Sequence, residues 1–223
     1  MHLMLEAENV LRADFGSIET AHARDILRRL LAFVCICGLA YGTIMGSFGG
    51  FAGDRIWQIL FSATKVPLLL LGTFLICLPS FFVLNTVFGV RADFPEAVRA
   101  LLAGQATMTI VLCSFAPFTV CWYLSSANYN AAVLFNAVVF GAGSLATQWV
   151  LRRLYGPLVR RNVKHRFLLR VWLLLYVFVG IQLGWALRPF VGHPTAAVQF
   201  VRPQMWGNAY VELLHHLLNL LPK

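Results

Sequence analysis

The stretch that decides the fold reads Gly38-Leu-Ala-Tyr-Gly42-Thr-Ile-Met-Gly46-Ser-Phe-Gly-Gly50, with a glycine at every fourth position. Residues four apart lie on one side of a helix, so these glycines would form a face without side chains. In an apolar segment, such a face lets a second helix backbone approach closely. Each glycine weakens a helix by about 1 kcal/mol relative to alanine. We therefore predict that Gly38, Gly42, Gly46 and Gly50 pack against another helix, of this chain or of a second one.

The composition around this stretch is that of a membrane protein. Of the 223 residues, 59% are hydrophobic and 12% are charged, whereas a soluble domain carries roughly 25% charged residues. The mean hydropathy is +0.73. A net charge of +9 would suggest nucleic acid as a partner of a soluble chain. Here the basic residues gather in short loops between apolar runs, which is typical of membrane orientation signals, and we predict no nucleic-acid partner.

Five apolar runs are long enough to cross a bilayer. They cover residues 30–51, 66–90, 97–124, 131–151 and 167–187. The first, at 1.5 Å per residue, reaches roughly 33 Å, which exceeds a hydrocarbon core of about 30 Å. The predicted fold is an all-α polytopic integral membrane protein with five transmembrane helices. The predicted organisation is a lead-in over 1–29, a transmembrane domain over 30–188 and a tail over 189–223.

The pattern is expected to be interrupted at four places. Residues 54–65 are predicted to connect the first two spans. Pro79 and Pro117 lie in mid-span, where a proline removes a helical hydrogen bond and kinks the helix. Gly156-Pro157 is expected to break the helix between two arginine pairs.

Both terminal segments are predicted to hold amphipathic helices. Apolar residues recur at helical spacing over residues 3–11, which favours a short helix on the membrane surface. The run 208–221 would reach only about 21 Å as a helix, too short to cross. We expect it to lie along the membrane or to dip into it.

The basic residues predict the orientation of the spans. The N-terminal segment has four Lys or Arg residues, the turn at 91–99 has two and the loop at 152–170 has seven, which gives thirteen on one side against five on the other. Cytoplasmic loops carry the excess of basic residues. The N-terminus is therefore predicted to be cytoplasmic and the C-terminus outside, in a bacterial inner membrane.

The loop between the fourth and fifth spans is the strongest charge signal, because it contains no acid. Its basic residues are Arg152, Arg153, Arg160, Arg161, Lys164, Arg166 and Arg170. One interpretation is a topology signal that binds anionic lipid headgroups, each residue contributing about 1 kcal/mol near the surface. The other is a docking site for an acidic cytoplasmic partner.

The predicted spans carry amides but no ionisable residue at mid-depth. Ion-coupled transporters need such residues to carry charge, so this pattern argues against ion-coupled transport. The amides are Asn85, Gln105, Asn136, Gln148 and Gln182. They are expected either to hold helices together or to line a polar path. Gly180 and Gly184, again four apart, predict a second packing face on the fifth span.

No catalytic or metal-binding motif occurs in the sequence. His215 and His216 are adjacent, whereas two ligands on one helix face need a spacing of three or four. All five cysteines lie within apolar runs and are interpreted as small buried hydrophobic residues. We predict no cofactor, no metal and no enzyme activity. Catalysis through the tail, where His193, Arg202 and Glu212 could meet, is retained as a third hypothesis.

Three features resemble the YIP (Ypt-interacting protein) family of five-span membrane proteins. They are Lys65-Val-Pro-Leu-Leu at the start of the second span, Pro117 in the third and Gly141-Ala-Gly-Ser144 in the fourth. Together with the order of spans and loops, the resemblance covers roughly residues 60–188. It implies a role in membrane organisation with trafficking partners and no enzyme activity. The long tail departs from the family, and no functional residue is transferred.

These observations favour a non-catalytic membrane scaffold or a subunit of a membrane complex, which packs through glycine-faced helices. The expected partners are anionic lipids and either further copies of this chain or other membrane proteins. The alternative is a channel or an uncoupled transporter of small solutes or lipids, suggested by the two proline-kinked spans and their amides.

Overall fold

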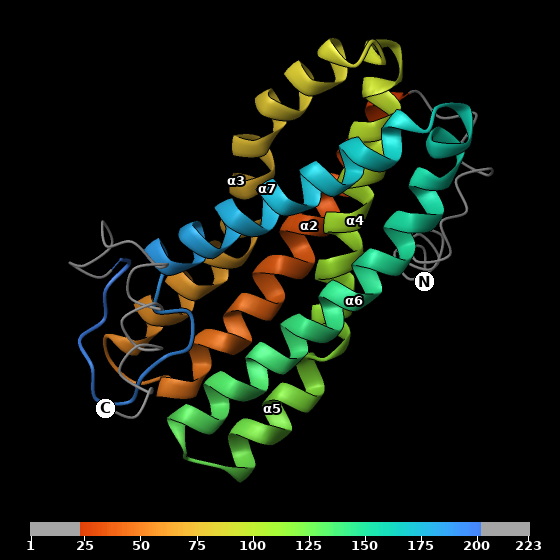
Figure 1. Cartoon of the computed structure of the whole chain (residues 1–223). Helices are drawn as coiled ribbons and strands as arrows, with labels where there is room; N and C mark the ends of the chain where they lie inside the picture. Colours follow the sequence, from red (N-terminus) through yellow and green to blue (C-terminus); the bar gives the residue numbers. More distant parts are fainter. Residues whose placement is uncertain (1–22, 202–223) are drawn as a thin grey trace, which may run out of the picture.

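The computed structural model describes residues 23–201, and this part of the chain is built from helices without a strand (Figure 1). In chain order the elements are α2 (Ala23–Gly46), the 3-10 turn η2 (Ser47–Gly49), α3 (Arg55–Val87), the 3-10 turn η3 (Arg91–Asp93), α4 (Phe94–Ser114), α5 (Ala116–Ser125), α6 (Tyr129–Arg161) and α7 (Lys164–Ala186). Within the described part, five helical segments are long and apolar enough to cross a membrane. The predicted all-α, five-span fold is confirmed. The predicted amphipathic helices of the two termini lie outside the described residues.

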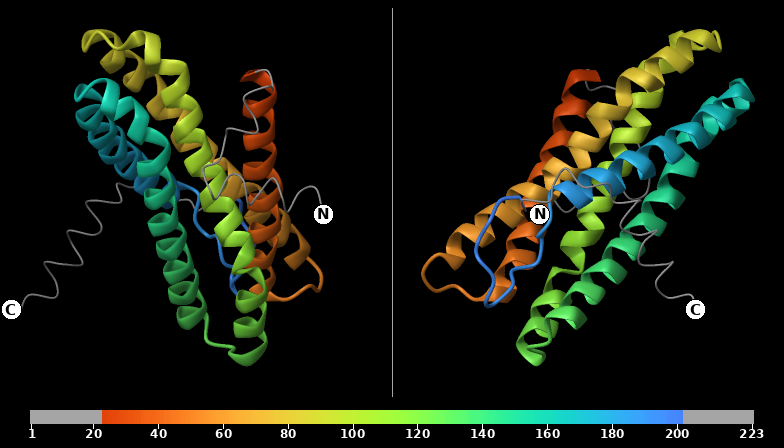
Figure 2. Two further views of the ribbon diagram at one scale, coloured as in Figure 1. Left: turned by 90° about the vertical axis from the view of Figure 1, so that its right-hand side faces the viewer. Right: turned by 60° about the vertical axis from the view of Figure 1, so that its left-hand side comes forward.

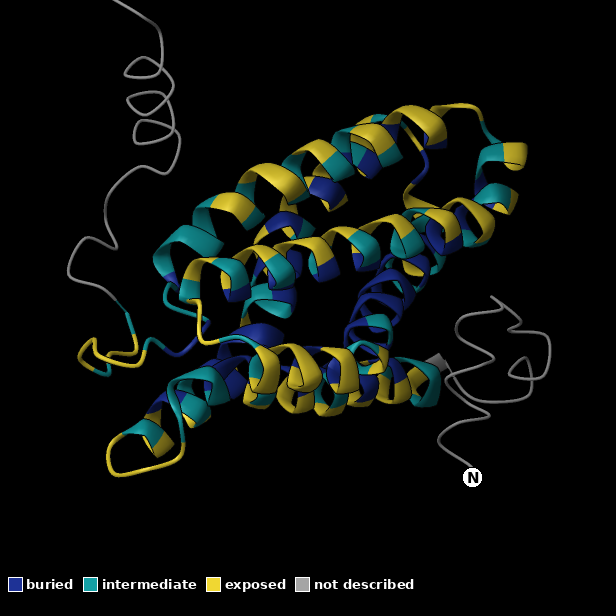
Figure 3. Cartoon of the chain, turned by 90° about the horizontal axis from the view of Figure 1, so that it is seen from below, coloured by how far each residue is buried: buried dark blue, intermediate teal, exposed yellow. Residues whose placement is uncertain are grey.

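The bundle is arranged around α4. This helix packs against α2 and α6, and α3 packs against α2 and α7 (Figure 2). In α4, 72% of the most apolar stretch is buried inside the bundle, whereas in α7 only 11% of that stretch is buried. Buried residues lie between the helices, and exposed residues lie on the outer faces (Figure 3). In a bilayer, the outer faces of α6 and α7 would therefore meet lipid chains.

The alternating direction of the helices gives the bundle two ends (Figures 1 and 2). The arginine end contains the start of α2, the loop at residues 88–93 and the connection at 162–163. The tail end contains residues 47–54, residues 126–128 and the segment 187–201. The start of α2 and the arginine loop thus share one end.

The glycine face of α2 lies directly on the first half of α3. A methyl group at Gly42 would lie 2.4 Å from the Ser62 carbonyl oxygen, and one at Gly46 would lie 2.7 Å from the Cα atom of Ile59. Real Cβ atoms do not come so close, so only glycine fits at these two positions. The two helices therefore meet backbone to backbone within one chain.

The other two glycines of the stretch behave differently from each other. Gly38 faces Pro67, whose ring would be 3.3 Å from an added methyl group. Gly50 follows the end of α2 and the turn η2, has a φ of 94° and has no atom within 4 Å of an added methyl group. The prediction that Gly50 belongs to the packing face is wrong, because the chain turns away before reaching it.

The helix α3 is longer than predicted, because it begins at Arg55 and takes in the predicted connection at residues 54–65. Its first three turns supply the surface on which the glycines of α2 pack. Pro67 and Pro79 both lie inside this helix. Pro67 is accommodated where α2 has no side chain, since its ring lies against Gly38.

The predictions for the prolines of the later helices differ in outcome, since one is confirmed and the other is wrong. The kink predicted at Pro117 is confirmed as a break, since α4 ends at Ser114 and α5 begins at Ala116. The break predicted at Gly156-Pro157 is wrong, because α6 runs without interruption to Arg161. Tyr155 and Leu158, on either side of this pair, are fully buried. Their packing outweighs the local preference for a break, as tertiary contacts often do.

Candidate functional site

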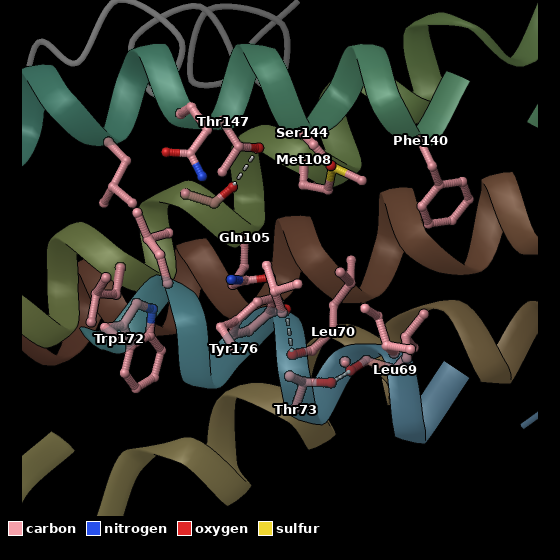
Figure 4. A pocket seen from close by; sticks show the side chains of 18 residues that line it. Leu69, Leu70, Thr73, Gln105, Met108, Phe140, Ser144, Thr147, Trp172 and Tyr176 are labelled. Atoms are coloured by element: carbon pink, nitrogen blue, oxygen red, sulfur yellow. Dashed lines mark hydrogen bonds between the residues drawn. The ribbon is translucent and has the colours of Figure 1, made fainter. Parts of the chain in front are cut away.

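A cavity of about 360 Å³ lies between α3, α4, α6 and α7 (Figure 4). Its size falls within the usual range of small-ligand pockets, roughly 300–1,000 Å³. The wall is mainly apolar. Leu69 and Leu70 come from α3, Met108 from α4, Phe140 from α6 and Trp172 from α7. The cavity exists because α6 and α7 contact each other far less than either contacts its other neighbour.

Two polar contacts fix the positions of the helices around the cavity. The Tyr176 hydroxyl on α7 lies 2.8 Å from the Gln105 Oε1 atom and 3.2 Å from the Leu70 carbonyl oxygen, so it can donate to either. The Thr147 hydroxyl on α6 donates to the Gly104 carbonyl oxygen over 3.4 Å. Tyr176 thus links α7 to α3 and α4, and Thr147 links α6 to α4.

The predicted polar path of five amides is not formed in the described chain. Gln105 and Gln148 both line the cavity. Asn85 is buried elsewhere on α3, where its amide nitrogen donates to the Phe81 carbonyl oxygen over 2.8 Å. Gln182 is half-buried on α7 and does not line the cavity. The amides therefore belong to separate places in the bundle.

Asn136 lies at the centre of a hydrogen-bond network near the tail end. The Tyr41 hydroxyl on α2 donates to the Asn136 Oδ1 atom over 2.9 Å, and the Asn136 amide nitrogen donates to the Tyr123 hydroxyl over 2.7 Å. The same nitrogen lies 2.8 Å from the Ala132 carbonyl oxygen. The network ties α2, α5 and α6 together, which is the helix-linking role predicted for such amides.

The second glycine face, on α7, makes looser contacts than the first. A methyl group at Gly180 would lie 3.6 Å from the Thr73 side chain, and one at Gly184 would lie 3.8 Å from the Leu69 side chain. These are ordinary van der Waals distances. Gly180 also lines the cavity, so its missing side chain contributes to the open space.

The segment 188–196 forms a strap across the tail end of α2 and α3. The Arg55 guanidinium donates to the carbonyl oxygens of His193, Pro194 and Ala196, at 2.7 Å for His193 and 2.8 Å for Ala196. The Ser62 hydroxyl donates to the Phe190 carbonyl oxygen over 2.5 Å. The strap is therefore held largely by side chains of α3 that bind its backbone.

Two further contacts seat the strap on α2. The Gly192 amide donates to the Met45 carbonyl oxygen over 3.3 Å. A methyl group at Gly192 would lie 2.5 Å from the Gly46 carbonyl oxygen, so the strap also requires a glycine. Gly46 thus contacts α3 through one side and the strap through its carbonyl.

Lys65 lies deeper in the bundle than the sequence predicts. It was predicted to lie at the edge of the second span, but it is ten residues inside α3 and fully buried. Its ammonium group donates to the Pro189 carbonyl oxygen over 2.6 Å and lies 5.2 Å from the centre of the Phe200 ring. A buried charge is stable only with such partners. The strap supplies the carbonyl oxygen, and Phe200, which follows the strap, supplies the ring.

The predicted arginine loop over residues 152–170 is not a loop, because α6 runs to Arg161, α7 begins at Lys164 and only residues 162–163 separate them. All seven of its basic residues are exposed. Two of them make contacts within the bundle. The Arg161 guanidinium lies 2.5 Å from a carboxylate oxygen of Glu96, and the Lys164 ammonium donates to the Phe88 carbonyl oxygen over 2.9 Å. The other five make no hydrogen bond or ion pair with the described residues. A surface with five arginines that have no partner within residues 23–201 thus covers this end.

Beneath the loop, His165 is fully buried at the start of α7. Its Nε2 atom lies 3.0 Å from a carboxylate oxygen of Asp93, and its ring packs against Tyr155 with 5.8 Å between the centres. Asp93 also lies 3.8 Å from Arg161. This cluster joins the loop before α4 to the connection between α6 and α7, and sequence reasoning had not identified it.

Of the three tail residues in the catalytic hypothesis, His193 is the one that lies within the described residues. Its Nδ1 atom accepts hydrogen bonds from the backbone amides of Thr195 and Ala196, both at 3.2 Å, and its ring packs on Tyr129. His193 thus shapes a turn of the strap. Arg202 and Glu212 lie outside the described residues, as do His215 and His216. Within residues 23–201, no group of three His, Cys, Asp or Glu side chains could hold a metal ion.

Comparison with protein-family models, with curated proteins and with solved structures gave no match for this chain. The resemblance to the YIP family therefore stays a prediction. The functional argument depends on the geometry described above.

Proposed function

We propose that the protein is a non-catalytic membrane scaffold or a subunit of a membrane complex. The observation that supports this most strongly is the strap at the tail end. Arg55 and Lys65, two cations of α3, are both committed to its backbone carbonyl oxygens. A charge held in this way fixes the shape of a surface. A fixed surface at one end and a basic surface at the other suit a protein that holds partners in place.

The proposal includes an orientation and a location. The basic surface of the arginine loop would lie on the cytoplasmic side of a bacterial inner membrane, where anionic lipid headgroups attract it. The strap would lie on the outer side. Partners would then be further copies of this chain or other membrane proteins, with lipid headgroups around the arginine end.

The test is the composition of the assembly in the native membrane. Membrane discs excised from cells with an amphipathic polymer would be examined by native mass spectrometry. We expect the chain to be found at a fixed ratio with a second copy or with another protein. Arg55→Ala, which releases the strap, is expected to lower the assembled fraction. Arg28→Ala removes an exposed arginine from α2 and serves as the control. A wild-type chain found entirely as a monomer would contradict the proposal.

A second candidate, an uncoupled lipid transporter, is favoured by the cavity between α6 and α7. A transporter of this kind would exchange lipids between leaflets without coupling to an ion. Proteoliposomes with fluorescent lipids separate the two candidates, because a chemical quencher added outside reports how fast labelled lipids arrive from the inner leaflet. Transport predicts complete quenching at a rate that rises with the protein content. A scaffold predicts the same partial quenching as protein-free liposomes.

A further inference from the structure

The cavity is open toward the surface between α6 and α7. Ser144 on α6 and Ile181 on α7 both line it, and both are exposed. Val177 also lines the cavity and is 55% exposed. From their connection at residues 162–163, α6 and α7 diverge along the bundle (Figures 1 and 2). Because these helices cross the membrane, the opening meets the hydrocarbon chains of the bilayer.

On α6, apolar side chains line both ends of the cavity, and Ser144, Thr147 and Gln148 lie between them. Phe140 and Ile181 lie at the part of the cavity farthest along α6 and α7 from the arginine loop, whereas Gln148 and Leu151 lie closest to it on α6. A hydrocarbon chain suits the first part. The Gln148 amide can donate a hydrogen bond, and it lies where the ester carbonyl of a lipid would follow the headgroup.

Arg152 and Arg170 lie at the arginine end of the opening. Arg152 lies four residues beyond Gln148 on α6, one turn or about 6 Å farther along the same face. Arg170 precedes Leu173 by three residues and Val177 by seven, so it shares their face of α7. Both arginines are exposed, and neither forms a hydrogen bond or an ion pair with a described residue. Guanidinium groups bind phosphate oxygens in a bidentate manner.

The nearby acids do not cancel this charge. Asp25, Asp93 and Glu96 are the acids at this end of the described chain, and they contact Arg28, His165 and Arg161, respectively. The cavity thus combines an apolar slot that opens to the bilayer with the Gln148 amide. At headgroup depth it is followed by Arg152 and Arg170, which have no partner among the described residues. We propose that this cavity binds one anionic glycerophospholipid, with an acyl chain in the slot and the phosphate between Arg152 and Arg170. The inference does not depend on the scaffold proposal, since either candidate function could use such a site.

The experiment is lipid titration of purified protein, stripped of lipid with detergent and monitored by native mass spectrometry. Phosphatidylglycerol is the test lipid, and phosphatidylcholine shows how far binding depends on net charge. The variant R152Q/R170Q removes the two proposed contacts. R153Q/R160Q is the matched control, because it removes the same charge from the same loop while Arg153 and Arg160 lie on another face of α6. We expect one phosphatidylglycerol per chain and an affinity at least about tenfold lower in R152Q/R170Q, with little change in the control.

A second pair of variants tests the slot itself. Gly180→Leu would fill the cavity from α7, whereas Gly141→Leu adds the same side chain at a position where nothing lies within 4 Å of an added methyl group. We expect only Gly180→Leu to abolish binding, with the thermal unfolding of both variants showing that they fold. Glycerol phosphate, a headgroup without chains, should not compete.

Three outcomes would overturn the proposal. Equal loss in the two double variants would mean diffuse attraction of lipid by the whole basic surface. Competition by glycerol phosphate would mean a site for free phosphate. Unchanged binding in a folded Gly180→Leu variant would place the lipid outside the cavity.

Discussion

The carbonyl oxygen of Ser62 on α3 lies 2.4 Å from the place that a methyl group would take at Gly42 on α2. The two backbones therefore approach too closely for a side chain at Gly42, and the spacing of glycines in α2 is what permits it. The same region of α3 binds the strap, because the Ser62 hydroxyl donates to the Phe190 carbonyl oxygen. The α2–α3 contact and the tail end thus form one structural unit.

The close contact predicts opposite effects of the same substitution at two glycines. Gly42→Ala is expected to lower the free energy of unfolding by about 1–3 kcal/mol, since the added methyl group overlaps backbone atoms. Gly141→Ala is expected to raise it by up to about 1 kcal/mol, because alanine is the better helix former and the site is open. Thermal unfolding in detergent measures both. A Gly42→Ala protein as stable as the wild type would contradict the contact.

The strap is expected to depend on the buried cation of Lys65. Lys65→Met keeps the length of the side chain but removes the donor to the Pro189 carbonyl oxygen. Hydrogen bonds to charged groups contribute about 1.5–3 kcal/mol, so amide protection of residues 188–196 should fall about tenfold or more. Hydrogen exchange with mass spectrometry reports this directly, and Thr64→Val, at an exposed neighbour, is the control. Unchanged protection of the strap in Lys65→Met would show that this contact does not hold it.

The network around Asn136 predicts energetic coupling between Tyr41 and Tyr123, which are not hydrogen-bonded to each other. Tyr41→Phe and Tyr123→Phe each remove one hydroxyl bonded to Asn136, and each is expected to cost about 0.5–1 kcal/mol of stability. Because both bonds position the same amide, the double variant should lose less than the sum of the two. A double-mutant cycle by unfolding measures the difference, and strict additivity would argue against a shared network.

Two acids at the arginine end, Asp93 and Glu96, are predicted to contribute different amounts to the stability of the protein. Asp93→Ala leaves the buried His165 without its carboxylate partner and is expected to cost about 1–3 kcal/mol. Glu96→Ala removes an ion pair with the exposed Arg161, and such pairs contribute about 0–1 kcal/mol. Unfolding of the two variants under identical conditions compares them. An equal or larger loss in Glu96→Ala would mean that the His165 contact is not what stabilises this end.

The fold followed from local patterns where one pattern dominated. Apolar runs long enough to span a bilayer indicated five helices, and glycines four residues apart indicated the face that packs on α3. Pro117 marked a true break, because its ring nitrogen cannot donate the helical hydrogen bond to the turn before it. At Gly156-Pro157 the same reasoning failed, since the buried Tyr155 and Leu158 keep α6 continuous.

The candidate site was only partly predictable, because it is made by the crossing of distant helices. Gln105 and Gln148 stood out as amides in apolar runs, but Tyr176 resembled any aromatic residue of a helix core. Its bond to Gln105 spans 71 positions in the sequence. Lys65 was placed at a span edge, because nothing local shows that carbonyl oxygens from a strap 124 positions away cover it.

The account holds that the buried charges of this bundle stabilise its shape and carry no current. The most direct test is the electrical current across a planar bilayer that contains the purified protein, recorded at both polarities and across a pH gradient. We predict no current above that of a protein-free bilayer. A protein-dependent current that disappears in Lys65→Met would contradict the account, because it would make the buried lysine part of a conducting path.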